Sequence, residues 1–391
     1  MKYKNANNIL PAELIESIQK YVQGEYIYIP IKEKQKSSIS SEYSLELQKR
    51  NAHIYTSSLQ GISNKKLSEQ YHLSESSIRR ILIHQRKRYE TMKNRIKHIL
   101  TNWNVTNPAF TQIYDTAWQI GNEYILKVYE NLNLLERNIK IITILDNMKI
   151  PTGKMILSKK AASYVHDDKY YYILLEKMQG SNIVSLKNNF GLAVEMGEIL
   201  ARLHIAFKKC ETQDEFWNNS LLDEMNGWVR NFFQDTGWKY IEEKTFDKTV
   251  LNLKSLYDKL PVQLIHRDVH FGNFLFYHGR FSGYIDFDLS QRNIRIFDLC
   301  YFCMGLLSEE ECMGITKEEW FELLRNVFAG YQGKLVLSLE EIKAVPYVMQ
   351  SIELLFAAWF FGEKDLKCAE NAMELYRFAE YNEQKIIDSI K

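Results

Sequence analysis

The sequence predicts an α+β protein in which a small, basic helical module precedes a larger domain of two lobes. Residues 1–100 carry 18 Lys and Arg against 9 Asp and Glu, whereas the rest of the chain carries 32 against 40. From about residue 105 onward, strand-like and helical segments are interspersed, and polar residues follow two of the strand-like segments. Such a charge imbalance indicates two parts with different partners, with chance variation as the alternative.

The bulk composition is that of a soluble globular protein. Hydrophobic residues make up 46% and charged residues 25% of 391 residues, which is enough for two or three domains. No apolar run reaches the length of a membrane-spanning helix, and the N-terminus has no apolar signal core, so we expect a cytoplasmic protein without a membrane partner. The five cysteines do not form a disulfide framework, and Cys300 and Cys303 are expected to be buried structural residues.

The first sixty residues contain three predicted elements. Apolar residues at helical spacing predict a helix over 12–22. Residues 25–31 are rich in β-forming side chains, and Pro30 restricts them to an edge strand or a strand end. After a polar, serine-rich loop, a second helix is predicted over about 42–60, ending at Gly61.

Two more predicted helices follow, joined by a tight turn. Ser63 is expected to cap a helix over 64–71, and Ser74 to cap a helix over about 75–88. The apolar residues of these helices are spaced to form a shared core, namely Leu67, Tyr71, Leu73, Ile78 and Ile81 or Leu82. This pattern is typical of a helix-turn-helix motif, and a solvated pair of helices is the alternative.

The second of these two helices predicts a DNA-binding surface. In a helix-turn-helix motif the N-terminal part of the second helix enters the major groove. Arginine there bonds guanine edges or phosphates, and serine bonds either. The residues expected to contact duplex DNA are Ser76, Ser77, Arg79, Arg80 and Lys65.

Residues ~10–88 resemble the Mor-type family of phage-derived transcription activators. The resemblance rests on the stretch IQKYVQGEYIYIP, the basic segment LQKRNAHIY and the tail GISNKKLSEQYHLSESSIRRIL. It implies a module over 1–88 that forms a homodimer through a strand at Tyr26–Ile29 and binds DNA through its tail. Glu25 stands where that family usually has a second glycine before the strand. A module that only mediates oligomerisation is the alternative.

The residues with catalytic potential lie in the segments QLIHRDVHFGNFLF and SGYIDFDLS. An apolar strand leads to His266 and Asp268, and Asn273 follows five residues later. A second strand then delivers Asp286. Transfer of a phosphoryl group from ATP needs an Asp that orients the attacking hydroxyl, and an Asn and another Asp that hold Mg²⁺ against the phosphates. The pattern therefore predicts catalysis by Asp268 and metal binding by Asn273 and Asp286.

Upstream segments predict the nucleotide site. The segment EYILKVY is a predicted strand whose Lys127 would contact the α- and β-phosphates. Glu136 opens the next helix and is the expected partner of Lys127, although Asn138 is the neighbouring face position; a surface Lys–Glu pair is the alternative. The segment YYYILLEKMQG predicts a buried strand and a linker where the backbone of Glu176 and Met178 meets adenine.

Residues ~105–391 resemble the aminoglycoside phosphotransferase and choline kinase family. The matching segments, in chain order, are ILKVY, LLEKMQG, LARLH, IHRDVHFGN, YIDFD and FDLCYF. The resemblance implies a two-lobed, protein-kinase-like fold with a nucleotide-binding lobe over 105–180. A helical lobe over 181–391 would carry the catalytic loop and acceptor site, and a helical connector at 89–104 would join the N-terminal module.

The same resemblance assigns residue roles. It makes Asp268 the catalytic carboxylate, with His266 orienting the catalytic loop, and Lys127 the phosphate-binding lysine. It makes Asn273 and Asp286 the magnesium ligands, with Asp288 as a further candidate for the metal and Asp298 as a brace of the loop.

Four features of the sequence compare this lobe with protein kinases and with the phosphotransferase family. The family often has glycine before the catalytic Asp. This chain has Arg267 there, which is the residue type found in protein kinases. The Leu-Lys pair usual in protein kinases after the catalytic Asp, and an Asp-Phe-Gly segment, are missing, which disfavours a protein substrate. The segment AFTQIYDTAWQIG lacks the G-x-G-x-x-G pattern expected over the phosphates.

The predicted function is an ATP- and Mg²⁺-dependent phosphotransferase fused to a DNA-binding module. Its acceptor would be a hydroxylated small molecule, such as an aminoglycoside or amino alcohol. A transcription regulator whose kinase-like lobe senses nucleotide or metabolite with little turnover is the alternative. Four residues of the last helices, Glu353, Trp359, Glu363 and Asp365, are candidates for the acceptor site, but their apolar surroundings favour a core position.

Overall fold

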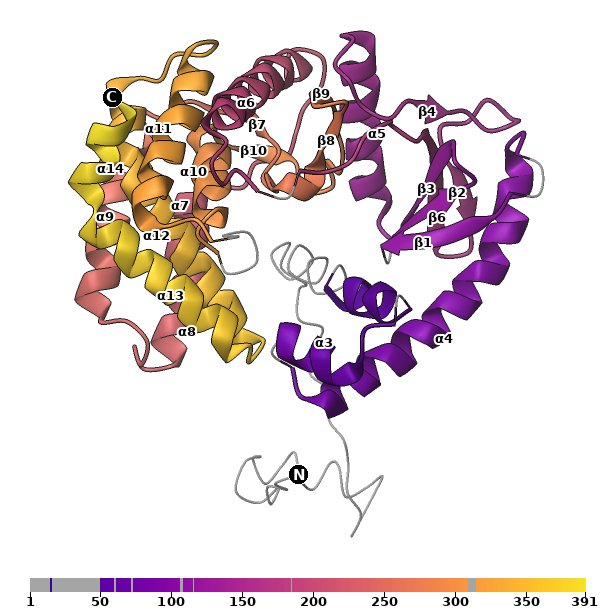
Figure 1. Ribbon diagram of the computed structural model, residues 1–391, viewed down its shortest axis with the longest axis horizontal. Coiled ribbons are helices and arrows are strands. Elements are labelled where there is room, and N and C mark those ends of the chain that lie inside the picture. The colour runs from indigo at the N-terminus through magenta and orange to yellow at the C-terminus, as the bar shows by residue number, and fades with distance from the viewer. Residues whose placement is uncertain are drawn as a thin grey trace. The chain divides into compact units, whose positions relative to one another are not determined.

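The computed structural model shown in Figure 1 describes residues 15, 50–59, 61–71, 73–105, 108–114, 116–183, 185–308 and 314–391. The predicted elements over 12–22 and 25–31, including the proposed dimer strand, therefore lie outside the described residues, apart from Ile15, which is helical. Contacts divide the chain into two compact units, Met1–Leu45 and Glu46–Lys391. The labelled helices and strands of Figure 1 all belong to the second unit.

Three helical segments open this unit, namely residues 50–59, α3 (Asn64–Gln70) and α4 (Glu75–Ile99). The hydroxyl groups of Ser63 and Ser74 cap α3 and α4, each accepting a hydrogen bond from the amide three residues on, as predicted. The predicted apolar residues do form a shared core, to which Ile54 of the preceding helix is added. We refer to residues 50–88 as the helical module.

The sequence predicted that the helix starting at Glu75 ends near residue 88. Helix α4 instead continues to Ile99 and into a short 3₁₀ helix, η2 (Leu100–Asn102). Its C-terminal half is packed against the nearby β-sheet. Met92, Ile96 and Ile99 share a core with residues of that sheet, and the ring of Tyr89 stacks on Trp118 with centroids 5.1 Å apart. The predicted connector is thus built into the sheet lobe.

The sheet has six strands, β1 (Phe110–Tyr114), β2 (Ala117–Ile120), β3 (Tyr124–Tyr129), β4 (Met155–Ile156), β5 (Val165–Asp167) and β6 (Tyr170–Glu176). Their order is β1-β2-β3-β6-β4, β5 also pairs with β6, and every pairing is antiparallel. Helix α5 (Leu132–Asn147) follows β3. The predicted strand of Lys127 is β3, and it pairs with the strand that leads to the predicted linker, so that Lys127 lies opposite Ile173.

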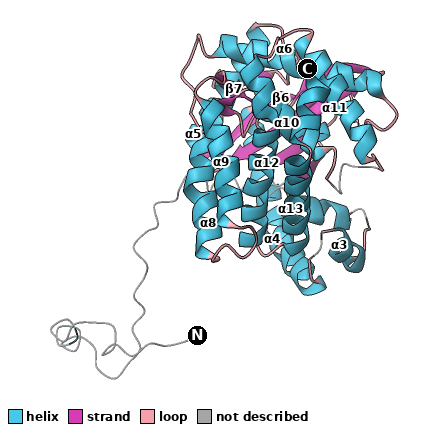
Figure 2. Ribbon diagram, turned by 90° about the vertical axis from the view of Figure 1, so that its left-hand side faces the viewer, coloured by secondary structure: helices cyan, strands magenta, loops and turns pink. Residues whose placement is uncertain are grey.

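The C-terminal lobe is mostly helical (Figure 2). Its helices are α6 (Phe190–Cys210), α7 (Leu221–Glu224), the π-helix η3 (Met225–Val229), α8 (Arg230–Asp235), α9 (Glu243–Tyr257), the 3₁₀ helix η4 (Phe271–Asn273), α10 (Ile296–Gly305), α11 (Lys317–Gln332), α12 (Leu339–Gly362), α13 (Leu366–Tyr381) and α14 (Glu383–Ile390). Two antiparallel strand pairs carry the polar motifs, β7 (Val262–Ile265) with β10 (Gln291–Ile294) and β8 (Phe274–Tyr277) with β9 (Arg280–Tyr284).

Close packing of α6 against α11 fixes the base of this lobe. A Cβ atom on Gly197 of α6 or on Gly330 of α11 would lie 1.9 Å from a backbone oxygen of the opposite helix, so both positions need glycine. The same contact brings Nδ1 of His204 on α6 to 2.7 Å from the hydroxyl of Tyr331 on α11. His204 is therefore held at a fixed position, from which its Nε2 reaches the carboxylate of Asp298 on α10.

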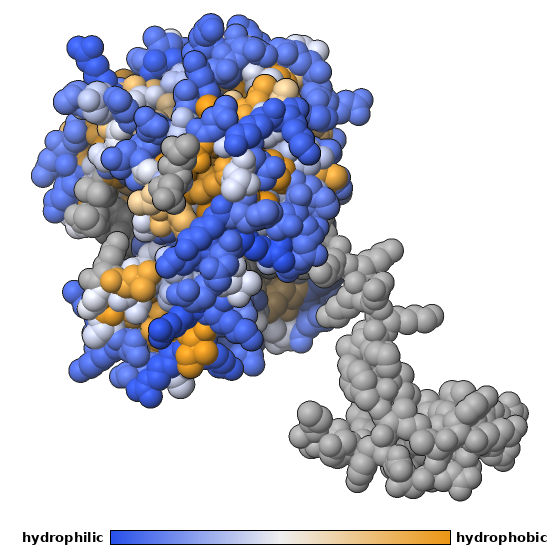
Figure 3. Space-filling view, turned by 90° about the vertical axis from the view of Figure 1, so that its right-hand side faces the viewer, coloured by the Kyte–Doolittle hydropathy of each residue, from blue (hydrophilic) through white to orange (hydrophobic). Residues whose placement is uncertain are grey.

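One described helix, α12, is long and apolar enough to cross a bilayer by length and composition, contrary to the expectation from sequence. In the protein 72% of its most apolar window is buried, as in the core helix of a globular domain. The buried positions of Cys300 and Cys303 agree with the prediction. Figure 3 shows that the described surface on one side is largely hydrophilic, with scattered apolar patches.

Candidate active site

The loop after β7 carries the motif HRDVHFGN and is braced by Asp298 of α10. The two carboxylate oxygens of Asp298 accept hydrogen bonds of 2.8 Å from the backbone amides of His266 and Arg267. Nε2 of His204 lies 3.0 Å from the same carboxylate. Arg267 has a φ of 68°, and its guanidinium contacts both oxygens of the buried Glu224 at 2.9 Å. The loop conformation is therefore imposed from within the lobe.

His266 lies beneath the site rather than in it. Its ring is fully buried, and burial lowers the pKa of the imidazole, which keeps it neutral. Nε2 lies 3.2 Å from the backbone oxygen of Ile285 and donates its proton there. Because Ile285 precedes Asp286, this bond ties the two polar motifs together. The family resemblance assigned His266 to the catalytic group as the residue that orients the loop, and its ring contacts the second polar motif from below.

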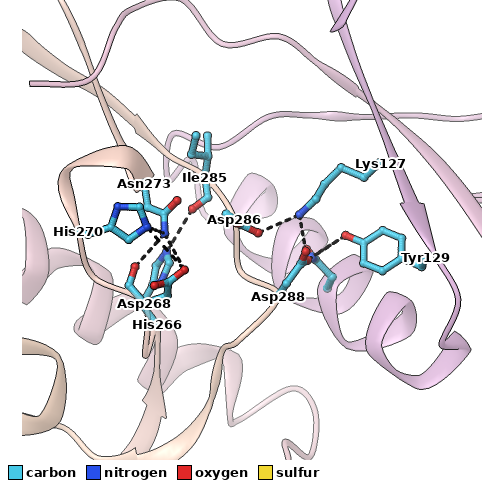
Figure 4. A network of polar contacts seen from close by, with 10 residues as sticks. Lys127, Tyr129, His266, Asp268, His270, Asn273, Ile285, Asp286 and Asp288 are labelled. Carbon is cyan, nitrogen blue, oxygen red and sulfur yellow. Dashed lines mark hydrogen bonds and ion pairs between the residues drawn. The ribbon is translucent and has the colours of Figure 1, made fainter. Parts of the chain in front are cut away.

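Asp268 faces the cavity and is held by several neighbours (Figure 4). The amide nitrogen of Asn273 lies 2.8 Å from the backbone oxygen of Asp268 and 3.3 Å from its carboxylate. The hydroxyl of Tyr301 lies 3.3 Å from the other carboxylate oxygen, Oδ1. Nε2 of His270 lies 3.7 Å from Oδ2, the oxygen that Asn273 contacts. Sequence reasoning missed His270 and Tyr301; a polar residue between Val269 and Phe271 in the motif was the available signal for His270.

Lys127 lies between two carboxylates of the second motif (Figure 4). Its ammonium nitrogen is 3.0 Å from Asp286 and 2.8 Å from Asp288. Asp288 also accepts hydrogen bonds from Tyr129, at 2.9 Å, and from Asn138. Burial alone would lower the pKa of Lys127, but the two carboxylates outweigh it and raise that pKa well above its usual value. Lys127 is therefore a permanent positive charge within the site.

The predicted pairing of Glu136 with Lys127 is wrong in register. Glu136 is exposed on α5, whereas the amide of the buried Asn138 reaches Tyr129 and Asp288. Residues two apart on an α-helix point in nearly opposite directions, so only one of the two can face the sheet. Glu136 thus lies on the surface, and Asn138 occupies the inward position.

Glu176 and Met178 line one side of a cavity of about 790 Å³, together with residues of the β1–β2 hairpin. Glu176 ends β6, and its amide donates to the oxygen of Lys154 at 2.7 Å. A Cβ atom on Gly283 would lie 2.0 Å from the Met178 methyl group, so this glycine leaves room for the thioether beside the cavity. This is the place where the sequence predicted adenine to bind.

The other side of the same cavity is acidic and aromatic. Glu353, Trp359 and Asp365 line it, although the sequence favoured core positions for them, while Glu363 is exposed and outside the described lining. The side chain of Glu353 is 5% exposed, and burial raises its pKa to about 8. The sequence pattern could not tell a core residue from a residue that lines the cavity, because both kinds of residue are largely buried.

The predicted DNA contacts lie on α3 and the first turns of α4. The hydroxyls of Ser76 and Ser77 are 2.8 and 2.9 Å from that of Ser74, so both belong to the cap of α4. Arg79 pairs with Glu75 at 3.2 Å. Two further predicted residues, Arg80 and Lys65, are exposed.

The donors around Lys127 fit a divalent cation that is shared with a nucleotide. Within the part of the chain that is described, no cluster of three His, Cys, Asp or Glu side chains could hold a metal alone. The amide nitrogen of Asn273 is committed to Asp268, which leaves its oxygen as a metal ligand beside the carboxylate of Asp286. Mg²⁺ takes one or two such oxygens and completes its shell with phosphates and water.

Comparisons with known proteins agree with this fold. Among solved structures, the amicoumacin kinase hAmiN is 19% identical, covers 77% of this chain and 95% of its own, and has a TM-score of 0.57. A microcompartment-associated aminopropanol kinase is 16% identical, covers 75% of this chain and 98% of its own, and has a TM-score of 0.55. Aminoglycoside 2'-phosphotransferase-IIIa is 16% identical, covers 74% of this chain and 98% of its own, and has a TM-score of 0.52. These identities support a shared fold.

Two matches at the sequence level complete the comparison. The Bacillus subtilis (strain 168) protein YraL, itself uncharacterised, is 43% identical over 84 residues, which is 21% of this chain and 97% of YraL. Residues 109–339, more than half of the chain, match the model of the phosphotransferase enzyme family. The chain therefore belongs to the phosphotransferase enzyme family.

Proposed function

We propose that the protein transfers the γ-phosphoryl group of ATP to a hydroxyl group of a small, cationic molecule with the help of Mg²⁺. The observation that carries the proposal is one continuous cavity. Asp268, Asp286 and Lys127 lie in it between a side lined by the end of β6 and a side lined by acidic and aromatic residues. The structurally similar hAmiN binds AMP-PNP and Ca²⁺, which supports the use of a nucleotide and a divalent cation.

Asp268 is placed to handle the acceptor proton. The acceptor oxygen attacks the γ-phosphorus and forms a new P–O bond, while the bond from the γ-phosphorus to the β–γ bridging oxygen breaks and ADP leaves. The proton of the acceptor hydroxyl passes to the carboxylate of Asp268. Asn273 and Tyr301 fix the direction in which this carboxylate points.

Lys127 and the metal-binding oxygens serve the nucleotide. The ammonium group of Lys127, whose side chain is 11% exposed, would offset charge on the phosphates. Asp286 and Asn273 would hold Mg²⁺, which supplies neutralisation of the charge on the β- and γ-phosphates. Asp288, held by Tyr129 and Asn138, keeps Lys127 in place.

The acceptor side favours a positively charged molecule. A buried carboxylate with a pKa of about 8 is stabilised in its ionised form by an incoming cation. Asp365 provides a second carboxylate, and the rings of Phe356, Trp359 and Phe360 line the same region and attract cations through their faces. An aminocyclitol or an amino alcohol has both the charge and the hydroxyl group.

An acceptor screen tests this proposal. ADP release is measured with Mg-ATP and kanamycin, 1-amino-2-propanol or uncharged trehalose, and phosphorylated products are identified by mass spectrometry. We expect turnover with an amine-bearing acceptor and none with trehalose. Absence of turnover across a broad amine panel, together with intact binding of Mg-ATP, would contradict the proposal and favour a nucleotide sensor.

Glu353→Gln tests the acidic acceptor side. Around pH 7 the wild-type Glu353 is protonated, because its pKa is about 8. A bound cation lowers that pKa, so binding of kanamycin releases about one proton from wild type and none from this position in the variant. Calorimetry at pH 7 in two buffers of different ionisation enthalpy measures the difference. Glu363→Gln, at the end of the same helix and exposed, is the matched control.

The same substitution changes the pH dependence of stability. The folded protein retains the Glu353 proton up to about pH 8, whereas the unfolded chain loses it above its ordinary value of 4.5. The free energy of unfolding therefore falls as pH rises through this window, and Glu353→Gln removes that contribution. If the free energy of unfolding depends on pH in the same way for wild type and Glu353→Gln, then Glu353 is ionised in the folded protein.

A second candidate function is binding of duplex DNA by the helical module. The observation that favours it is the exposed Arg79 and Arg80 on the first turns of a serine-capped α4, with Lys65 exposed on α3. The N-terminal turns of such a helix fit the major groove. Dimerisation through Tyr26–Ile29 is part of this proposal and concerns residues outside the described structure. A module that only mediates oligomerisation remains the competing proposal.

Arg80→Ala is the variant for this proposal. The full-length protein is expected to bind a randomised duplex pool with an affinity that falls as salt rises, because Lys and Arg contacts release counterions. Loss of one arginine contact should weaken binding about tenfold. Fluorescence anisotropy measures both effects, with Arg377→Ala on α13 as control. Salt-insensitive or absent binding at low ionic strength would favour oligomerisation, and a shift with Mg-ATP would favour a ligand-controlled regulator.

A further inference from the structure

Residues from outside the two kinase-like lobes line the cavity that holds the candidate active site. Arg50 and His53 come from the helix of residues 50–59, and Tyr71 follows α3. The hydroxyl of Tyr71 bonds Nδ1 of His53, so these two side chains form one unit. The helical module thus lines the same cavity as Asp268. The sequence did not predict this contribution.

Arg50 makes a direct contact with the acceptor side. Its Nη1 atom lies 3.6 Å from Oδ2 of Asp365, whose side chain is 4% exposed. The other oxygen of Asp365 accepts from the amide of Cys368 at 3.3 Å and caps α13. The carboxylate is therefore held in place by the helix, and the oxygen near Arg50 is the one available to a cation.

The geometry of this ion pair is that of a displaceable contact. A distance of 3.6 Å exceeds the usual length of a charge-assisted hydrogen bond, about 2.8 Å. Nε of Arg50 is buried and has no hydrogen-bond partner among the described residues. An unsatisfied buried donor has a free-energy cost, so the arginine is held less firmly than a bidentate pair would hold it.

The helix that carries Arg50 also has contacts outside the cavity. The helix that carries Arg50 shares a core with α3 and α4 through Ile54, and Tyr55 contacts Tyr89 with ring centroids 5.9 Å apart. The C-terminal half of α4 is fixed in the sheet lobe by the ion pairs of Arg95 with Asp167 and Asp168, at 3.0 and 2.8 Å. The helix that carries Arg50 is therefore linked through α4 to the sheet lobe.

We propose that Arg50 is an internal competitor of the acceptor, pairing with Asp365 until a cationic acceptor takes its place. This rests on the proposed function in so far as the acceptor is a cation. Without acceptor, Arg50 neutralises a nearly buried carboxylate that would otherwise be costly. With acceptor, the amine takes over that role and the helix of residues 50–59 is released from α13. Acceptor binding is thereby coupled to the helical module that carries Arg79 and Arg80.

Binding of kanamycin to full-length variants, measured by calorimetry without nucleotide, tests the competition. Arg50→Ala should bind kanamycin about fivefold more tightly than wild type, the size expected for a partly exposed ion pair. Arg50→Lys keeps the charge and should bind like wild type, and so should Arg377→Ala, which removes an exposed arginine of α13 outside the cavity lining. Unchanged or weaker binding by Arg50→Ala would overturn the proposal, since a residue that contributes to the acceptor site would give weaker binding.

A double-mutant cycle shows whether Asp365 is the shared partner. Asp365→Asn retains the cap of α13, because Asn caps helices as well as Asp does, but removes the charge. In that background Arg50→Ala should leave the affinity for kanamycin unchanged. An equal gain from Arg50→Ala with and without Asp365→Asn would place the effect of Arg50 elsewhere.

Hydrogen exchange of the free protein separates this proposal from the identity of the acceptor. Arg50→Ala and Asp365→Asn should each raise amide exchange across residues 50–59, while exchange in β3 and β6 stays the same. If kanamycin and 1-amino-2-propanol bind to no variant, the proposal of a cationic acceptor is wrong. The exchange data alone then show whether the Arg50–Asp365 ion pair holds the helix of residues 50–59. Unchanged exchange in both variants would overturn it.

Discussion

Asp268→Asn is expected to lower turnover by about a thousandfold while leaving the affinity for Mg-ATP within about twofold of wild type. Asn has the shape of Asp and can still contact Asn273 and Tyr301, but its amide cannot take the acceptor proton. The loss should therefore appear in kcat rather than in the KM for ATP. Single-turnover product formation and calorimetric titration of the nucleotide measure the two quantities separately.

The control for this substitution is Asp258→Asn, an exposed carboxylate at the end of α9. It changes the net charge by the same amount and should have no effect. Retention of wild-type turnover by Asp268→Asn would mean that another group takes the proton. His270, with Nε2 at 3.7 Å from the Asp268 carboxylate, would then be the next group to test.

Much of the geometry of the candidate site could be predicted because the spacing of its residues is set locally. Asp268 and Asn273 lie on one loop, and hydrogen bonds within that loop set their spacing. The caps at Ser63 and Ser74 are likewise local, since each serine bonds an amide three residues on. The strands of Lys127 and of the predicted linker could be read from short apolar runs with β-forming residues.

The predictions from sequence that the structure corrected concern the register of a helix, the end of a helix, and contacts between segments far apart in sequence. Glu136 and Asn138 differ by two positions on α5, and only the direction of the helix relative to the sheet decides which of them faces Asp288. Helix α4 continues past residue 88 because no Gly or Pro stands there to stop it, and its apolar residues find partners in the sheet. The contact of Arg50 with Asp365 joins segments that are far apart in sequence, and no local pattern encodes it.

Asp286→Ala is expected to abolish the dependence of nucleotide affinity on Mg²⁺, a loss of about a hundredfold in the presence of the metal. Of the two carboxylates beside Lys127, Asp286 lines the cavity and is 24% exposed at its side chain, whereas Asp288 is 4% exposed and held by Tyr129 and Asn138. Asp286 can therefore serve the metal while Asp288 keeps Lys127 in place.

The matched variant Asp288→Asn separates these two roles. It removes one of the two charges that raise the pKa of Lys127 and should lower turnover, but Mg²⁺ should still strengthen ATP binding. Calorimetric titration of ATP with and without Mg²⁺, for wild type and both variants, gives the comparison. If Asp288→Asn loses the Mg²⁺ dependence and Asp286→Ala keeps it, the metal ligand is Asp288. The fixed carboxylate held by Tyr129 and Asn138 would then bind the cation, and Lys127 would depend on Asp286 alone.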